Sequence, residues 1–420
     1  DMANAAHRAE VAALWGIPDV PATPGKSAVE LFRALKSGEV KAVWIACTNP
    51  AQSLPDQALV HEALQAAEFV IVQEAFGHTE TCAYADLLLP ATTWGEKDGT
   101  VTNSERAISR VRAAVPAPGE ARHDWAIVVD FARRLGARLG EAELAARMFP
   151  YTRPEEIWNE HRESTRGRDL DITGLSYALL ENTGPQQWPF PEGASAGKVR
   201  LYEDGVFPTP GGRARFVATE HRITAESPSA RFPLHLNSGR LRDQWHGMSR
   251  TGTAARLFGH APEAVLGLHP DELRQRNLQP GELIHLRSRR GGLILPVQAD
   301  EALQPGQAYL PMHWGDRFLK GLGTNVLTQP AFDPLSKQPE LKLSAVQVER
   351  AELPWQFFAL VEGDVQRRLE ALRPLFEHFA YASLAPTGRE QRPALLIKAA
   401  AEAAPDAALL AAIDALLGVD

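Results

Sequence analysis

The chain has 420 residues, of which 44% are hydrophobic and 23% are charged. These proportions exclude a chain that is disordered over most of its length, and the length predicts two or three domains. Forty-four basic and fifty-two acidic side chains give a net charge of −8, which excludes an overall attraction to nucleic acid or to an anionic membrane.

An alternation of helical and extended patterns runs to about residue 140. Its first helical pattern places Val29, Phe32 and Leu35 on one stripe. Repeated β-α-β units of this kind predict a mostly parallel sheet covered by helices on both faces. The predicted helices cover 27–38, 55–68 and 123–140, and the predicted strands cover 40–47, 69–75 and 86–90.

The pattern changes twice after this alternation. Helices are predicted over 153–164 and 174–182, followed by an irregular stretch rich in proline and glycine. From about residue 231, short apolar runs separated by turn residues predict a small β-barrel, with a hairpin around Arg290, Gly291 and Gly292. The alanine-rich end predicts helices with one strand over 394–398. We therefore expect an α/β domain over 1–225, a barrel domain over 226–350 and a helical tail over 351–420.

Polar side chains gather after the predicted strands of the α/β domain. Ligands of open α/β sheets bind beyond the carboxyl ends of the strands, so these side chains predict a polar rim for a ligand. Capping and turn formation explain the last of the three segments equally well. The candidates are Cys47, Thr48 and Asn49, then Gln73, Thr79 and Thr81, and then Asn103 and Glu105.

The barrel domain contributes a basic loop. Between residues 237 and 260 there are four arginines and one acidic residue, Asp243. Arginine suits diphosphate oxygens, and Trp245 can stack on a flat heterocycle. The alternative is a solvated basic loop, which an exposed tryptophan makes less favourable. The candidates here are Arg240, Gln244, Trp245, His246 and Arg250, with His313, Asn325 and Lys337 farther along the chain.

Metal binding by this chain is not predicted. Its two cysteines, Cys47 and Cys82, are too few for a disulfide framework or a four-thiolate site. No cluster of histidine and carboxylate residues has the spacing of metal ligands. We therefore assign no metal ligand and no catalytic residue within the chain.

Four segments in sequence resemble the carboxyl-terminal half of molybdopterin oxidoreductases, above all the bacterial assimilatory nitrate reductases. The first two are CTNPAQSLPD and QEAFGHTETCAYADLLLPATTWGEKDGTVTNSERAI. The other two are NSGRLRDQWHGMSRTG and NVLTQPAFDPLSKQPELKLSAVQVE. The similarity extends over roughly residues 1–350.

The resemblance implies a cofactor and a reaction. It implies bis(molybdopterin guanine dinucleotide) with molybdenum, held by the candidate residues above, and a barrel of the double-psi type. It also implies reduction of nitrate to nitrite by oxygen-atom transfer in the cytoplasm, with electrons from a donor protein or reductase subunit. Glu105 would accept from guanine, and Arg240 and Arg250 would neutralise diphosphate.

The chain departs from the family in what it lacks. The family's 4Fe-4S cysteines and molybdenum ligand lie in an amino-terminal part that has no counterpart here, and the chain opens with Asp1 before Met2. We therefore expect a portion of a larger subunit that is inactive alone. A formate dehydrogenase of the same superfamily and a non-catalytic cofactor-binding scaffold are the alternatives.

Overall fold

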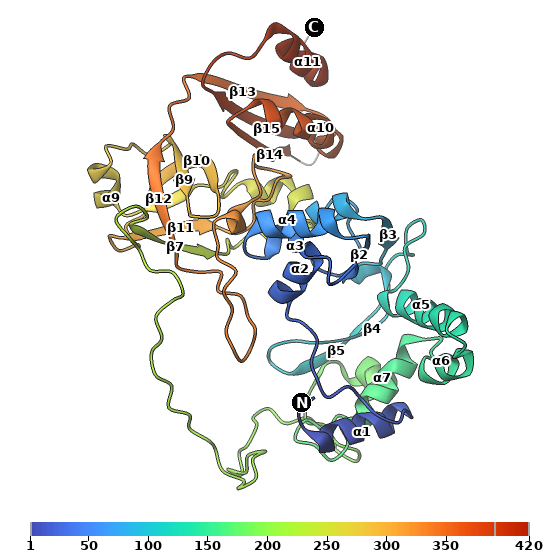
Figure 1. The fold of residues 1–420 in the computed structure, drawn as a ribbon. Coiled ribbons are helices and arrows are strands. Elements are labelled where there is room, and N and C mark those ends of the chain that lie inside the picture. The colour runs from blue at the N-terminus through green and yellow to red at the C-terminus, as the bar shows by residue number, and fades with distance from the viewer. Residues whose placement is uncertain (1, 390–391, 419–420) are drawn as a thin grey trace. The chain divides into compact units, whose positions relative to one another are not determined.

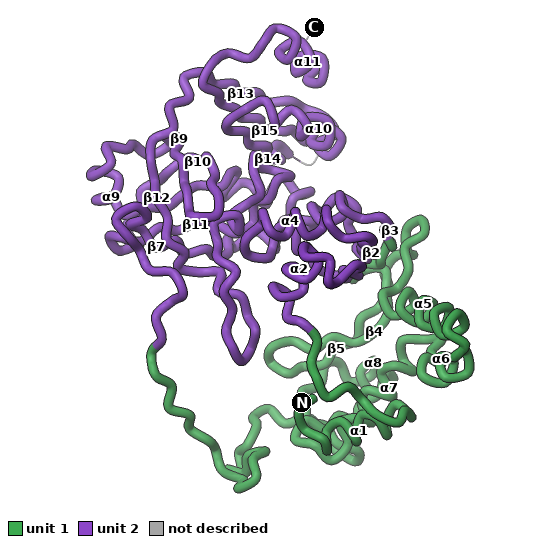
Figure 2. Tube along the Cα trace, in the orientation of Figure 1, with its two compact units in different colours: residues 1–25, 89–221 green, residues 26–88, 222–420 purple. Residues whose placement is uncertain are grey.

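The structure is a computed structural model, and it describes residues 2–389 and 392–418. It divides into two compact units, each of which combines segments that are far apart in the sequence (Figure 2). Unit 1 comprises residues 1–25 and 89–221, and unit 2 comprises residues 26–88 and 222–420. The units therefore do not follow one another along the chain.

Unit 1 combines α-helices, short antiparallel strands in the order β4-β5-β6 and long irregular segments. Its core contains Ile108, Trp158, Leu175 and Phe190. The helices predicted over 123–140, 153–164 and 174–182 are present as α5, α7 and α8. The helices are α1 (Ala5–Trp15), α5 (Asp124–Arg138), α6 (Ala142–Met148), α7 (Pro154–Glu163) and α8 (Tyr177–Thr183), and the strands are β4 (Gly99–Thr102), β5 (Ala107–Val111) and β6 (Gln186–Gln187), with the short 3-10 helix η2 (Trp94–Glu96).

The first part of unit 2 contains the predicted parallel strands. β1 (Ala42–Ala46) and β2 (Phe69–Glu74) pair in parallel in a sheet of order β1-β2-β3. Apolar side chains of both strands pack against two helices, and a reciprocal capping box between Ser27 and Glu30 starts the first of these helices. The other elements are α2 (Ala28–Lys36), α3 (Pro50–Ser53), α4 (Gln57–Ala66), η1 (Glu80–Tyr84) and β3 (Leu87–Pro90).

The second part of unit 2 is a closed barrel of order β10-β8-β11-β7-β12-β9 (Figure 1). Two of its pairings, β11 with β7 and β10 with β8, are parallel, and the others are antiparallel. The predicted hairpin is present, because Gly292 of β10 pairs with Arg287 of β9. The strands are β7 (Leu234–Gly239), β8 (Leu266–Leu268), β9 (Leu283–Arg287), β10 (Gly292–Ala299), β11 (Gln307–Pro311) and β12 (Ser344–Arg350). The short helices are η3 (Thr251–Thr253), η4 (Ala255–Phe258), α9 (Pro270–Gln275) and η5 (Thr324–Val326).

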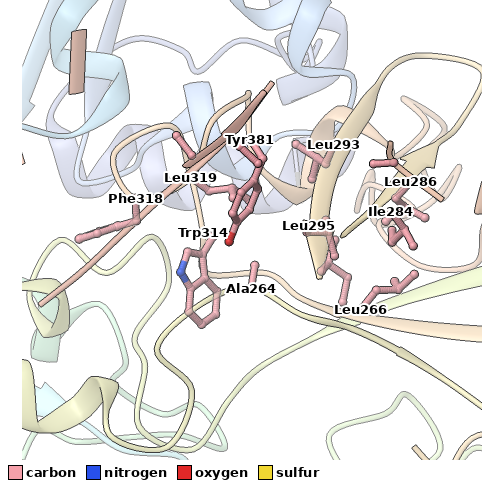
Figure 3. Close-up of a cluster of buried hydrophobic side chains, with 14 of the residues drawn as sticks. Ala264, Leu266, Ile284, Leu286, Leu293, Leu295, Trp314, Phe318, Leu319 and Tyr381 are labelled. Carbon is pink, nitrogen blue, oxygen red and sulfur yellow. The ribbon is translucent and has the colours of Figure 1, made fainter. Parts of the chain in front are cut away.

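Alternating apolar residues of the barrel strands point inward and form its core. Figure 3 shows Leu266, Ile284 and Leu295 within this cluster, together with Trp314 and Tyr381. Trp314 is fully buried although it lies in a loop after β11. Burying a large apolar side chain contributes about 1.5–3 kcal/mol, so this cluster fixes the loops that leave the barrel.

The C-terminal region contains less helix than we predicted. We expected a helical tail with one strand over 394–398, and the structure has a three-stranded antiparallel sheet of order β13-β15-β14 as well as helices. The predicted strand over 394–398 lies within β15. Because alanine favours helices, the alanines hid the rest of β15 and the strand β14 from the sequence pattern. The elements are β13 (Trp355–Glu362), α10 (Val365–Leu372), η6 (Arg373–His378), β14 (Tyr381–Arg389), β15 (Arg392–Ala401) and α11 (Ala407–Leu417).

Across the residues that the structure describes, no helix combines the length and the apolar composition that a membrane crossing requires.

Candidate functional site

Two strands of unit 2 end side by side and place the first group of candidate residues. β1 ends at Ala46, which faces Gln73 of β2. The backbone N–H of Cys47 donates to the carbonyl oxygen of Gln73 (3.1 Å), and Cys47 has a φ of 59°. Non-glycine residues rarely adopt this left-handed conformation, which here turns the chain out of the strand direction. Cys47 and Thr48 are exposed beyond the sheet, whereas Gln73 is buried.

Asn49 joins the turn after β1 to the short helix η1. Its Oδ1 accepts from the backbone N–H (3.1 Å) and the hydroxyl (2.7 Å) of Thr81, and its Nδ2 donates to Glu80. The Thr81 hydroxyl oxygen in turn accepts from the N–H of Ala51 (3.1 Å). Thr79 is buried, and its hydroxyl contacts the sulfur of Cys82 (3.1 Å). The side chains of Asn49, Thr79 and Thr81 therefore hold the turn in place.

The basic loop after β7 presents a cationic and aromatic surface. The guanidinium carbons of Arg240 and Arg250 lie 6.0 Å and 5.1 Å from the ring centre of Trp245. All three side chains are exposed, and so is His246. Partial desolvation of the ring, together with the charges of Arg240 and Arg250, lowers the pKa of His246 below its ordinary value of 6.5, which favours the neutral imidazole at pH 7. The surface thus combines two fixed positive charges with one aromatic face.

Gln244 lies beneath this surface. It is 7% exposed, and its Nε2 donates to the carbonyl oxygen of Leu257 (3.2 Å). Its Oε1 is buried and has no hydrogen-bond partner among the described residues. A buried polar atom without a partner marks a place where a ligand or an ordered water completes the bonding.

Close packing brings the basic loop to the turn after β1. A Cβ at Gly247 would lie 3.0 Å from Oε1 of Gln52 and 3.6 Å from Nδ2 of Asn49. Only a glycine allows this approach without displacement of a neighbour. Gln52 also donates through Nε2 to the carbonyl oxygen of Met312 (3.0 Å). The strand-end turn, the basic loop and the segment after β11 therefore meet within unit 2.

Asn325 ties a further barrel segment to the same turn. Its Nδ2 donates to the carbonyl oxygens of Gln52 (3.2 Å) and Ser53 (2.8 Å). Asn325 is 6% exposed. In this structure its side chain therefore bonds the protein backbone, although we predicted it as a cofactor-binding residue.

Three charged side chains lie near the place where the turn after β1 meets the segment after β11. None of them was predicted from the sequence as a binding residue. Glu80 and Arg317 are buried, and Asp316 pairs with Arg373. Burial raises the pKa of Glu80, with Asp316 adding to the effect, and burial also raises the pKa of Asp316. Burial lowers the pKa of Arg317, whose Nη2 donates to Gln366. One polar atom in each of these three side chains, Oε1 of Glu80, Oδ1 of Asp316 and Nη1 of Arg317, has no partner among the described residues.

The signal for these charged residues was weak in the sequence. Glu80 stands between Thr79 and Thr81 in the polar segment after the second strand, so its position was visible but its burial was not. Asp316 and Arg317 follow a buried tryptophan in a loop, and charged residues in a loop are normally exposed to solvent.

The remaining candidates lie elsewhere. Lys337 is exposed, and its ammonium nitrogen lies 5.2 Å from the ring centre of Phe332. Asn103 and Glu105 belong to unit 1, in the turn between β4 and β5, and both are exposed. Oδ1 of Asn103 accepts from the N–H groups of Glu105 and Ala107 at 3.0 Å each, so Asn103 shapes this turn.

The donor set fits an anionic, flat ligand better than a directly bound metal ion. Within residues 2–389 and 392–418, no three His, Cys, Asp or Glu side chains are grouped to hold a metal ion. Arg240 and Arg250 suit the oxygens of a diphosphate, and Trp245 suits a heterocycle. The unpaired Oε1 of Gln244 adds a buried acceptor to the same loop. These features match a dinucleotide ligand.

Comparison with known proteins gives the same assignment. The family described as "Molybdopterin oxidoreductase" matches residues 2–134, and the "Molydopterin dinucleotide binding domain" matches residues 234–345. A nitrate reductase of Klebsiella oxytoca is 40% identical over 348 residues, which cover 80% of this chain and 38% of that protein. A formate dehydrogenase alpha subunit of Methanocaldococcus jannaschii is 35% identical over 311 residues, which cover 74% of this chain and 43% of that protein.

The chain thus spans less than half the length of either relative. Among solved structures, acetylene hydratase from Pelobacter acetylenicus shares the fold with a TM-score of 0.59 at 18% identity, over 77% of this chain and 46% of that protein. The first family match covers the parallel strands β1 and β2, and the second covers most of the closed barrel. The four sequence segments that resemble this family lie in the same two regions and in the same order. The chain belongs to the molybdopterin oxidoreductase family.

Proposed function

We propose that this chain binds bis(molybdopterin guanine dinucleotide) as part of a molybdenum enzyme that reduces nitrate to nitrite. The observation that carries the proposal is the exposed pair Arg240 and Arg250 next to the ring of Trp245, in a loop that packs through Gly247 against the turn after β1. When bound, the cofactor supplies the molybdenum at which nitrate gives up an oxygen atom.

The residues of this chain would hold and orient the cofactor. Arg240 and Arg250 would neutralise diphosphate oxygens, and Trp245 would cover a flat ring. Thr48 and Cys47 are exposed at the strand end and would contact the ligand directly. Asn49, Thr79, Thr81, His313 and Asn325 would act mainly by holding these contact residues, because their side chains bond the protein itself.

Several finer assignments belong to the same proposal. Glu105 would accept from the guanine edge, and Gln73, Asn103, Gln244, His246 and Lys337 would complete the cofactor contacts. We further propose the domain division 1–225, 226–350 and 351–420, a 4Fe-4S cluster outside this chain, electrons from a donor protein or reductase subunit, and a cytoplasmic enzyme. These expectations follow from the family resemblance.

Formate oxidation is the second candidate activity, since a formate dehydrogenase subunit is 35% identical. The nitrate proposal is favoured because a relative named nitrate reductase is 40% identical over a longer segment. The test is turnover by the full-length protein that contains this chain. We expect nitrate reduction with a reduced dye as electron donor and no formate oxidation with a dye acceptor. Formate oxidation without nitrate reduction would reject the choice of substrate, and a cofactor-loaded protein with neither activity would indicate a scaffold.

The cofactor assignment can be tested at Arg240. Replacing Arg240 by alanine removes a charge-assisted partner of roughly 1.5–3 kcal/mol, so cofactor affinity should fall roughly ten- to hundredfold. The measurement is the molybdenum and guanine content of the purified full-length variant.

Arg242 provides the matched control. It lies two residues away in the same loop, but its guanidinium already pairs with Asp243 (2.8 Å) and is 73% exposed. We therefore expect Arg242→Ala to retain the cofactor content of the parent protein. Equal molybdenum and guanine content in the Arg240 and Arg242 variants would contradict the assignment of Arg240.

A further inference from the structure

The basic loop has a conformation that needs support from outside itself. Residues 240–250 form neither helix nor strand, yet they carry Arg240, Trp245 and Arg250. A segment without regular backbone pairing keeps one conformation only when other groups bond its N–H and carbonyl groups. The conformation of this loop therefore depends on hydrogen bonds from neighbouring side chains.

His313 bonds the loop at two points. It lies two residues beyond β11 and is completely buried. Its Nε2 accepts from the backbone N–H of Leu241 (2.8 Å), and its Nδ1 donates to the backbone carbonyl oxygen of His246 (2.7 Å). One imidazole thus spans the segment 241–246, which lies between the two arginines.

This arrangement requires one protonation state. A backbone N–H can only donate and a carbonyl oxygen can only accept, so Nδ1 must carry the proton and Nε2 must be free of one. Burial lowers the pKa of His313, and the charge of Arg240 and, once it is protonated, the charge of His246 lower it further, although the bond to the His246 carbonyl opposes the shift. The other titratable groups at the loop are His246 itself, Asp243, which pairs with Arg242 and His260, and Tyr309, whose hydroxyl donates to the carbonyl oxygen of Arg240 (3.0 Å).

We infer that His313 is a positioning residue: its neutral imidazole ties Leu241 and His246 to the barrel, so that Arg240, Trp245 and Arg250 are presented together to the cofactor. This inference rests on the proposed function for the role of the loop. The sequence analysis assigned His313 to direct cofactor contact, and its burial with both ring nitrogens engaged points to this different role.

The first test compares two substitutions by amide hydrogen exchange in the chain without cofactor. His313→Leu removes both bonds, so the amides of 241–246 should exchange roughly tenfold faster or more. His313→Gln offers one N–H donor and one carbonyl acceptor and should retain most of the protection. His285→Leu, on β9 of the same barrel, is the matched control and should leave this loop unchanged.

The second test uses pH and remains informative even when the leucine variant fails to fold. Because the pKa of His313 is lowered in the docked loop, the released loop binds a proton more readily below the ordinary value of about 6.5. Protection of 241–246 should therefore fall between pH 7 and pH 5, after correction for intrinsic exchange. His313→Gln should remove most of this dependence. His246→Gln should preserve most of it, since His313 bonds the carbonyl oxygen of His246 and the side-chain charge of His246 is the smallest cause of the lowered pKa of His313.

The outcomes separate this inference from the proposed function. Parental exchange rates in His313→Leu, or the parental pH dependence in His313→Gln, would overturn the positioning role. Faster exchange in His313→Leu with reduced molybdenum and guanine content in the full-length variant would support it. Failure of the proposed function would appear instead as parental cofactor content in Arg240→Ala, because the exchange experiments need no cofactor.

Discussion

Glu80 carries a carboxyl group in a place that disfavours its charge. It is 7% exposed, and its Oε1 has no hydrogen-bond partner among the described residues, while its Oε2 accepts from Asn49. Burial is the largest cause of its raised pKa, and the nearby carboxyl group of Asp316 adds to it. The folded state therefore binds a proton more readily than the unfolded state above pH 4.5, so this group lowers the stability as the pH rises through that range.

Replacing Glu80 by glutamine should remove this pH-dependent loss. The amide keeps an oxygen for Asn49 without a charge, so we expect the free energy of unfolding at pH 8 to rise by about 1 kcal/mol. At pH 4 the difference from the parent protein should be smaller, because Glu80 is then largely protonated in both states. Urea denaturation at the two pH values measures both quantities.

Glu62 on α4 is the control for this substitution. Its side chain is 54% exposed and pairs with Lys36, so Glu62→Gln should change the stability by less than about 0.5 kcal/mol at either pH. A gain in Glu80→Gln that is equally large at pH 4 and pH 8 would show that the charge of Glu80 is not the cause.

The candidate residues also show what the sequence can predict at this scale. The grouping of Arg240, Trp245 and Arg250 in one basic and aromatic loop could be predicted, because charge and aromatic content are visible in the residue types. The bonding of Asn49 and His313 to the protein was not predicted. Amides and imidazoles have the same donors and acceptors for a ligand as for the backbone, so their role depends on tertiary geometry.

At the scale of elements, Gly315 keeps the loop after β11 close to η1. A Cβ at Gly315 would collide with Oε1 of Glu80 and would lie 3.0 Å from Cγ of Gln52. Glu80 is buried and held by Asn49, so it cannot move aside freely. We expect Gly315→Ala to lower the free energy of unfolding by about 1–3 kcal/mol, measured by urea denaturation.

Gly77 is a matched control in the same unit. A Cβ there would meet Leu88 at 3.9 Å, which is an ordinary contact, and the residue is exposed. Gly77→Ala should therefore change the stability by less than about 0.5 kcal/mol. If Gly315→Ala were equally mild, the close approach of η1 to this loop would not contribute to stability.

Elements whose apolar residues follow a clear helical or strand pattern were predicted, whereas β8 and β14, which lack such a pattern, were missed. The stripe of Val29, Phe32 and Leu35 became α2, and the run of β-branched residues in the second strand became β2. The three-residue strand β8 was missed because it is too short to show an alternation. β14 was missed because its burial comes from its neighbours rather than from a pattern of its own residues.

At the scale of the whole molecule, the composition of the two units could not be predicted from local patterns. Unit 2 joins residues 26–88 to residues 222–420. The hydrogen bond from Asn325 to Gln52 connects residues 273 positions apart in the sequence. Periodicity and turn residues describe neighbours along the chain, so they predict elements but not which distant segments share a core.

The segment that leads from unit 1 into the second part of unit 2 gives a test of this arrangement. Residues 214–224 form neither helix nor strand, and Phe216 is 98% exposed and Ile223 79% exposed. Exposed irregular segments are cleaved first by proteases, so trypsin should cut early at Arg213, Arg215 or Arg222. Gel electrophoresis in denaturant should then show two fragments of about half the chain each.

These fragments should stay together under native conditions, because the amino-terminal fragment contains residues 26–88 of unit 2. Asn325 and the N–H of Asp56 bond across the two fragments, to the carbonyl oxygens of Ser53 (2.8 Å) and Thr328 (3.2 Å). Size-exclusion chromatography should therefore elute them together at the volume of the uncut chain without denaturant, and at the later volume of half-length chains in guanidinium chloride. Elution at the half-length volume under native conditions would show that residues 26–88 do not share a stable unit with the barrel, and the candidate site built from both would then lose its support.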